Sequence, residues 1–284
     1  MAVVHEITTE AQTSNINQLS FSHDPGNGTN KVLIVAIGIY DLTAGNRPVL
    51  TVTWNGISLT KIRSDENTTN GFRTEIWYLI NPSDSNAQVV ITTTSDVSRL
   101  KAGASTYTGA SQDANPIDNS NGSNASSGDP STLLAVSSSG CMLIDCVSVD
   151  TSGVGAAGSG QNIRWNQVGT SQEAAGSDEL AGSAGDYTQT WDIDGSSGFA
   201  HTVIALKEVV ITEKNVSDAG SGSESPSLET IYNKNLSDSG ASSEALDKPY
   251  TAITMGETGA GTESVGNLAS IPINDELLPE ESNF

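Results

Sequence analysis

The sequence has few of the residues on which most catalytic chemistry depends. Its 284 residues include 2 cysteines and 3 histidines, and no HExxH, CxxC pair, Walker A or GxSxG motif is present. Two carboxylates could still hydrolyse a glycosidic bond, and the best candidate is Glu75 beside Trp77. The strand around them holds one acid rather than several alternating acids, so we predict that the chain is not an enzyme.

The two cysteines lie five residues apart in Cys141-Met-Leu-Ile-Asp-Cys146. An odd spacing puts them on opposite faces of an extended strand, where they cannot bridge each other. We therefore expect two buried thiols that behave as small hydrophobic side chains.

Basic residues and long apolar segments are also scarce. The chain has 12 Lys and Arg against 34 Asp and Glu, a net charge of −22. Such a surface repels phosphate groups, so we expect no nucleic-acid partner and no docking on an anionic membrane. No segment approaches 18 consecutive apolar residues and the N-terminus has no basic region before an apolar one, so we predict neither membrane insertion nor a Sec signal. Export would then use another route, such as cell lysis.

What is abundant is Gly, Ser, Thr and Asn, which favours strands and turns over helices. The unbroken apolar run in Lys31–Tyr40 predicts a central strand that is covered on both faces. Val49–Trp54 and Ile57–Thr60 flank Asn55-Gly56, a strong signal for a hairpin with a type I′ turn.

Many further short strands are predicted, with long loops between some of them. The strands are Phe72–Ile80, Gln88–Thr94, Ala102–Thr108, Thr132–Val136, Met142–Val149, Ile163–Val168, Tyr187–Ile193 and Phe199–Leu206. The loops are Asn119–Asp129 and Thr151–Gly160. This pattern predicts an all-β fold, a jelly-roll-like β-sandwich domain over residues 1–212, followed by an acidic repeat extension over 213–284 with short strands and a flexible end.

The extension contains a repeat. Lys214–Gly220 recurs 20 residues later as Lys234–Gly240, and a weaker third copy follows 19 residues farther on. Each copy is predicted to be a turn with a short strand that buries too little to be stable alone. Its stability must then come from stacking along the chain, from other copies of the protein, or from docking on a host surface.

Two sets of residues are candidate binding groups. Carboxylates suit calcium, and the repeat acids are the positions to inspect, although a solvated acidic turn is the simpler interpretation. They are Asp218, Glu224, Asp238, Glu244, Glu257 and Glu263. Of the four tryptophans, Trp54 beside the hairpin turn and Trp165 in a polar neighbourhood are the more ligand-like and could stack on sugar rings, although core packing is commoner. We expect no cofactor other than calcium.

Three segments together resemble a known class of protein. They are Thr53-Trp-Asn-Gly-Ile-Ser-Leu-Thr60, Glu75-Ile-Trp-Tyr-Leu-Ile-Asn-Pro82 and the closing Ala205-Leu-Lys207. They resemble β-sandwich modules of tailed-virus and bacterial surface proteins, and the acidic Gly-Ser repeats are similar to C-terminal segments of phage head, tail and fibre proteins. The resemblance covers most of the chain and brings no catalytic residues.

The resemblance implies a virion structural protein on the particle surface, as capsid decoration or as a tail or fibre component. Its expected partners are copies of itself, other virion proteins and, through weak multivalent contacts, cell-surface glycans. A carbohydrate-binding adhesin and an extracellular filament subunit remain the alternatives.

Overall fold

The computed structural model describes residues 2–42, 47–150, 154–169, 171–193, 198–210, 214–218, 233–238 and 252–257. The chain divides into two compact units, Met1–Val209 and Val210–Phe284. Every regular element in the described residues is a β-strand, which confirms the predicted all-β class. Within this part of the chain there is accordingly no helix of the length and hydrophobicity needed to cross a bilayer.

Among its described residues, the first unit has 17 strands. In its first half these are β1 (Val4–Thr13), β2 (Ile16–His23), β3 (Val32–Tyr40), β4 (Val49–Trp54), β5 (Ile57–Ser58), β6 (Thr60–Asn67), β7 (Phe72–Ile80), β8 (Ala87–Val97) and β9 (Arg99–Thr108). In its second half they are β10 (Ile117–Ala125), β11 (Ser131–Val136), β12 (Cys141–Val149), β13 (Val154–Ala157), β14 (Asn162–Gln167), β15 (Glu173–Ala181), β16 (Gly185–Ile193) and β17 (Phe199–Leu206).

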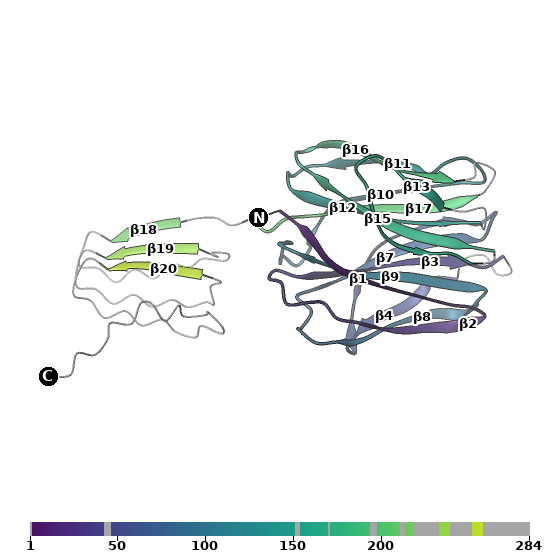
Figure 1. Cartoon of the computed structure of the whole chain (residues 1–284), viewed down its shortest axis with the longest axis horizontal. Coiled ribbons are helices and arrows are strands. Elements are labelled where there is room, and N and C mark those ends of the chain that lie inside the picture. Colours follow the sequence, from purple (N-terminus) through teal and green to yellow (C-terminus); the bar gives the residue numbers. More distant parts are fainter. Residues whose placement is uncertain are drawn as a thin grey trace. The chain divides into compact units, whose positions relative to one another are not determined.

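These strands form four stacked antiparallel sheets rather than the two of a single sandwich (Figure 1). The orders are β2-β8-β4-β5, β1-β9-β3-β7-β6, β10-β17-β12-β15-β14 and β11-β16-β13. The first two sheets enclose one apolar core and the last two enclose another. A further cluster fills the space between the two middle sheets. The range 1–212, predicted as one sandwich, therefore holds two sandwich-like modules.

The two modules repeat one another in strand order. When β3 is matched to β12, β1, β9, β7 and β6 correspond to β10, β17, β15 and β14. In the other two sheets, β2, β8 and β4 correspond to β11, β16 and β13. β5 is the one strand of the first module without a counterpart among the described strands. The register repeats as well. β1 and β10 each have a β-bulge at equivalent positions, where Glu6 and Asp118 are the unpaired residues. β6 and β14 likewise each have an equivalent β-bulge, with Ile62 and Arg164 unpaired.

The two acids at these bulges have the same structural task. Glu6 Oε1 accepts hydrogen bonds from the backbone N–H groups of Asn27 and Gly28, at 3.1 and 3.2 Å, in the loop after β2. Asp118 Oδ2 accepts one from the backbone N–H of Ser137, at 2.7 Å, in the loop after β11. The shared detail indicates an internal duplication, although the sequences of the two modules show no visible repeat.

Alternation along the central strands explains the four layers. On β3, Leu33, Val35 and Ile37 point into the first module, whereas Val32, Ile34 and Ala36 point toward the second. A strand that is apolar on both faces can be buried on both, as the run in Lys31–Tyr40 predicted. On β12, Cys141 faces the core of the second module and Cys146 faces the first module, so the predicted opposite orientation is confirmed and both thiols are free and buried.

The modules pack about a pseudo-two-fold axis. β3 lies on β12, β1 lies on β14, and β6 lies on β10. Because β14 corresponds to β6 and β10 corresponds to β1, exchanging the modules maps one edge contact onto the other. The junction therefore has two edges that are equivalent in backbone but differ in side chains. We call the β1–β14 edge the mate of the β6–β10 edge.

Local predictions succeed where the sequence signal is strong. Thr53 pairs with Ser58 across Asn55-Gly56, whose φ angles of 50° and 75° are those of the expected type I′ turn. The predicted loops Asn119–Asp129 and Thr151–Gly160 are wrong, because β10 occupies most of the first and β13 lies within the second.

β10 is polar for a tertiary reason. The side-chain amides of Asn119 and Asn121 donate hydrogen bonds to the backbone carbonyls of Ala135 and Leu133 on β11, at 2.9 and 2.7 Å. These side chains join the edges of two facing sheets, so the strand needs no apolar alternation.

In the second unit, the described strands are β18 (Lys214–Asp218), β19 (Asn233–Asp238) and β20 (Ala252–Glu257). They form a parallel sheet in the order β18-β19-β20. Lys214 pairs with Lys234, and Asp218 pairs with Asp238, so residues 20 positions apart in the chain lie side by side. Asp238 pairs with Glu257 in turn.

Candidate functional site

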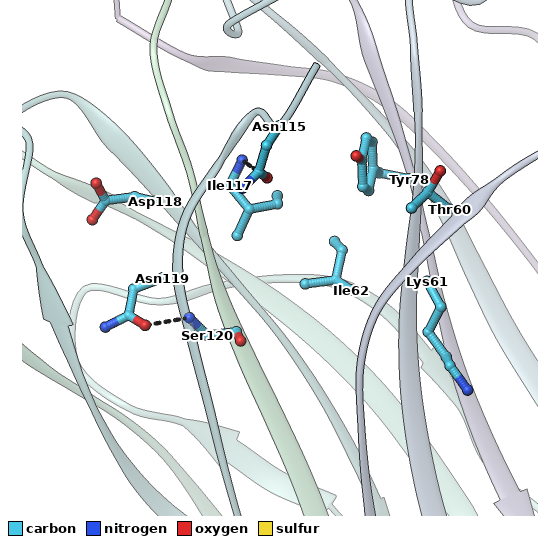
Figure 2. Close-up of a pocket in the computed structure, with 9 residues that line it drawn as sticks. All are labelled: Thr60, Lys61, Ile62, Tyr78, Asn115, Ile117, Asp118, Asn119 and Ser120. Atoms are coloured by element: carbon cyan, nitrogen blue, oxygen red, sulfur yellow. Dashed lines mark hydrogen bonds between the residues drawn. The ribbon is translucent and has the colours of Figure 1, made fainter. Parts of the chain in front are cut away.

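An open crevice of about 400 Å³ lies at one edge of the junction between the modules (Figure 2). One wall is formed by β6 and β7 of the first module, and the other by the start of β10 and the segment before it. Its lining residues are Thr60, Lys61, Ile62, Tyr78, Asn115, Ile117, Asp118, Asn119 and Ser120. The volume is within the range of small-molecule sites, roughly 300–1,000 Å³.

The floor of the crevice is apolar. Ile62 and Ile117 point toward one another from opposite walls, and the ring of Tyr78 lies beside them (Figure 2). Ile62 projects into this space because it is the bulged residue of β6. The hydroxyl of Tyr78 donates a hydrogen bond to the Ala114 carbonyl at 3.1 Å, which ties the ring to the segment before β10.

The charged side chains of the rim are engaged by protein partners. Lys61 Nζ lies 3.8 Å from Glu75 Oε2 and 5.5 Å from the centre of the Trp77 ring. Both carboxylate oxygens of Asp118 accept hydrogen bonds from Ser137, and one accepts a further bond from Ser138.

Uncharged polar groups complete the rim. Asn115 Oδ1 accepts a hydrogen bond from the backbone N–H of Ile117 at 3.1 Å, which orients the amide at the mouth of the crevice. Within the described residues, the side-chain hydroxyls of Thr60 and Ser120 bond to no other protein group. The crevice thus presents an apolar floor with hydroxyl and amide groups above it.

The mate of this crevice, at the other edge of the junction, has different chemistry. The repeated register matches Ile62 with Arg164 and Tyr78 with Asp178. Arg164 Nε donates to Asp178 Oδ2 at 2.6 Å, and the hydroxyl of Tyr107 donates to the same oxygen at 3.2 Å. At the mate edge an ion pair therefore links these two positions. At the crevice edge the same two positions are Ile62 and Tyr78, which form no polar bond with each other.

A second arrangement, inside the second module, resembles a catalytic chain. His201 Nε2 lies 3.1 Å from Asp145 Oδ2, and His201 Nδ1 lies 2.9 Å from Thr132 Oγ1, which lies 2.6 Å from Ser123 Oγ. Hydroxyl, imidazole and carboxylate in this order are the parts of a nucleophilic triad. Thr132, His201 and Asp145 are each at most 2% exposed, so a substrate has no access to them.

The contacts of Asp145 indicate a structural role for this network. Besides His201, its carboxylate accepts hydrogen bonds from the Trp191 indole at 2.7 Å, from Gln161 at 3.2 Å, and from the backbone and hydroxyl of Ser177. A buried carboxylate is stable when such donors surround it. The register places Val35 and Ala102 at the positions of Asp145 and His201 in the first module, so the fold also accepts an apolar core there.

Trp54 and Trp165, the predicted sugar-stacking residues, lie in the interior. Trp54 is 0% exposed and donates its indole hydrogen to the His23 carbonyl at 3.2 Å. Trp165 is 4% exposed and packs between the modules, against glycines on both sheets. A Cβ on Gly103 would lie 2.3 Å from the Trp165 ring, and a Cβ on Gly176 would lie 2.2 Å from it. Neither tryptophan offers a surface to a ligand.

The carboxylate considered for catalysis is also interior. Glu75 is 0% exposed and accepts hydrogen bonds from Arg73 Nε at 2.7 Å and from the Trp77 indole at 3.0 Å. These contacts hold it as part of a buried ion pair.

Of the predicted calcium ligands, Asp218, Asp238 and Glu257 lie at neighbouring positions across the parallel sheet. Glu224, Glu244 and Glu263 lie outside the described residues. In the part of the chain that the structure describes, no group of three or more His, Cys, Asp and Glu side chains could hold a metal ion. Calcium binding therefore stays a prediction.

No protein-family model matches the chain, and no curated protein sequence is significantly similar to it. The geometry of the molecule is thus the basis for a functional interpretation.

Sequence reasoning missed the crevice. Tyr78 carries no local signal, since it lies on a strand whose apolar residues are expected to be core. The facing residues Asn115 and Ile117 belong to a segment that was not predicted as a strand. Recognising the site would have required the strand pairing of both modules.

Proposed function

We propose that this chain is a structural protein that acts by assembly and display rather than by catalysis, and that it is exposed on a virion as capsid decoration or as part of a tail or fibre. The observation that carries the proposal is the parallel, in-register pairing of one strand from each repeat of the second unit. A stack of this kind can be extended by further copies, because β18 and β20 each have one described partner in the sheet.

The first unit suits display. We assign both modules to the jelly-roll class. The orders β1-β9-β3-β7 and β2-β8-β4-β5 in the first module support this assignment, and the described strands of the second module repeat these orders apart from β5. The two modules share an apolar junction and form one compact unit, which suits presentation as a single body. The resemblance of Thr53–Thr60 and Glu75–Pro82 to surface modules of tailed viruses supports placing this body on a particle.

The test of assembly uses the full chain and two variants at one position. Leu236 is in the middle of β19, between Val216 and Met255 in the register. Leu236→Pro removes a backbone donor from the sheet, whereas Leu236→Val keeps the donor and favours a strand. We expect light scattering to show a defined oligomer or polymer for the parent chain and for Leu236→Val, and a lower mass for Leu236→Pro.

Two outcomes would count against assembly through the repeats. One is a parent chain that stays monomeric up to its solubility limit, and the other is a Leu236→Pro variant with the parent mass. Immunogold labelling with antibodies to the first unit then distinguishes the setting. Label on released virus particles supports the virion proposal, whereas label restricted to cells or to filaments supports the adhesin or filament alternative.

A further inference from the structure

We propose that the crevice between the two modules binds one residue of a neutral saccharide. This inference does not depend on assembly by the second unit. It begins from the pseudo-two-fold relation between the open crevice and its mate. At the other edge of the junction, the equivalent backbone positions carry Arg164 and Asp178, which form an ion pair. The apolar floor of the crevice is therefore a property of the side chains that β6 and β7 carry, not a requirement of the fold.

The floor fits one face of a sugar ring. A pyranose presents C–H groups on its faces and hydroxyls around its edge. Tyr78, Ile62 and Ile117 supply an aromatic ring and two aliphatic side chains toward the same space. Burying the C–H face on them removes apolar area from water on both sides.

The rim fits the edge of the same ring. Thr60 and Ser120 offer hydroxyls that can donate and accept, and the Asn115 amide offers two further hydrogens. Sugar hydroxyls need partners of this mixed kind when they leave water. The groups come from both modules, so a ligand would contact both walls.

Charge selects a neutral ligand over an anionic one. Lys61 is directed to Glu75 and to the Trp77 ring, and the Asp118 carboxylate is directed to Ser137. Each of these two charges thus already has a protein partner. The chain as a whole carries a net charge of −22, which repels sialic and uronic acids.

The experiment uses the full chain and defined probes. The neutral probes are the methyl glycosides of glucose, galactose and N-acetylglucosamine, and the anionic probes are those of sialic acid and glucuronic acid. Saturation-transfer NMR and amide shift titrations, followed at Asn115 and Ser120, measure binding and its location. We expect at least one neutral glycoside to bind saturably with these amides shifting, and the anionic ones to bind more weakly.

Variants separate the crevice from other sites. The double variant Thr60→Val and Ser120→Ala removes two hydroxyls and leaves the floor intact, so affinity should fall roughly tenfold, as two lost neutral hydrogen bonds imply. Tyr78→Phe keeps the ring and should retain binding, whereas Tyr78→Leu should lose it. Thr188→Val, an exposed position on β16, is the matched control and should bind as the parent does.

Three results would overturn the proposal. They are the absence of saturable binding by every neutral probe, equal affinity in the double variant and the parent, and tighter binding of an anionic probe. If Tyr78→Leu fails to fold, the double variant still decides the matter. The crevice variants should not change the oligomer mass, so failure here leaves the assembly proposal standing.

Discussion

Acidification should destabilise the first module through one buried imidazole. His23 is 0% exposed, and its two ring nitrogens lie 2.8 Å from the hydroxyls of Thr9 and Thr106. Burial lowers its pKa from 6.5 to about 4, a shift that the nearby Asp24 opposes in part. The folded state therefore keeps His23 neutral at pH values where the unfolded chain is already protonated.

The sign and size of the effect follow from linkage. Below pH 6.5 the unfolded state binds more protons than the folded state, so stability falls as the pH drops toward 4. With these two pKa values, the contribution of His23 to the free energy of unfolding is about 2.4 kcal/mol lower at pH 4.5 than at pH 7.

The assay compares urea unfolding of the parent and of His23→Gln at both pH values. Glutamine is uncharged and can form hydrogen bonds with Thr9 and Thr106, so it serves as a non-titrating replacement. Tryptophan fluorescence follows unfolding, and one of the four tryptophans, Trp54, lies at the site because its indole donates to the His23 carbonyl. We expect the parent to lose about 2 kcal/mol more than the variant on acidification. Equal losses in the two proteins would refute the assignment of this effect to His23.

Two buried charged groups give further predictions. In urea unfolding, Asp145→Val should destabilise the chain by about 3–5 kcal/mol, because the Trp191 indole and the other donors around the carboxylate lose their acceptor. Asp186→Val, at an exposed position of β16, is the control and should leave the free energy of unfolding nearly unchanged. Lys101 is 0% exposed, and burial lowers its pKa from 10.5 to about 8. Between pH 7.5 and 9.5 the folded state loses this proton while the unfolded state keeps it, so the free energy of unfolding should rise by about 2 kcal/mol. Lys101→Met should lack that rise, and a rise of equal size in the variant would assign it to another group.

Some features of this protein could be predicted from the sequence because the signal is local. The apolar run of β3, the Asn55-Gly56 turn and the opposite orientation of the two buried cysteines of β12 depend on neighbouring residues and on the period of two along a strand. The 20-residue repeat likewise could be read directly from Lys214–Gly220 and Lys234–Gly240, since both copies keep the same residue types.

Other features were decided by tertiary structure. The repeated module is not visible in the sequence. A module is defined by its backbone pairing and by an inward apolar face, and many different side chains satisfy these two requirements. Val35 and Asp145 occupy the same position in two cores, one apolar and one held by hydrogen bonds. β10 is a strand because Asn119 and Asn121 bond to a facing sheet, a contact that no local pattern announces.

The candidate site shows the same division. Sequence properties favoured tryptophans as ligand-binding groups, but their size makes them the side chains that fill space between sheets, and Trp54 and Trp165 are buried there. At the crevice edge of the two-fold junction, Ile62 and Tyr78 occupy the positions that Arg164 and Asp178 occupy as an ion pair at the other edge. The sequence thus determined where strands and repeats form, whereas the packing of one module on the other decided which side chains reach a shared opening.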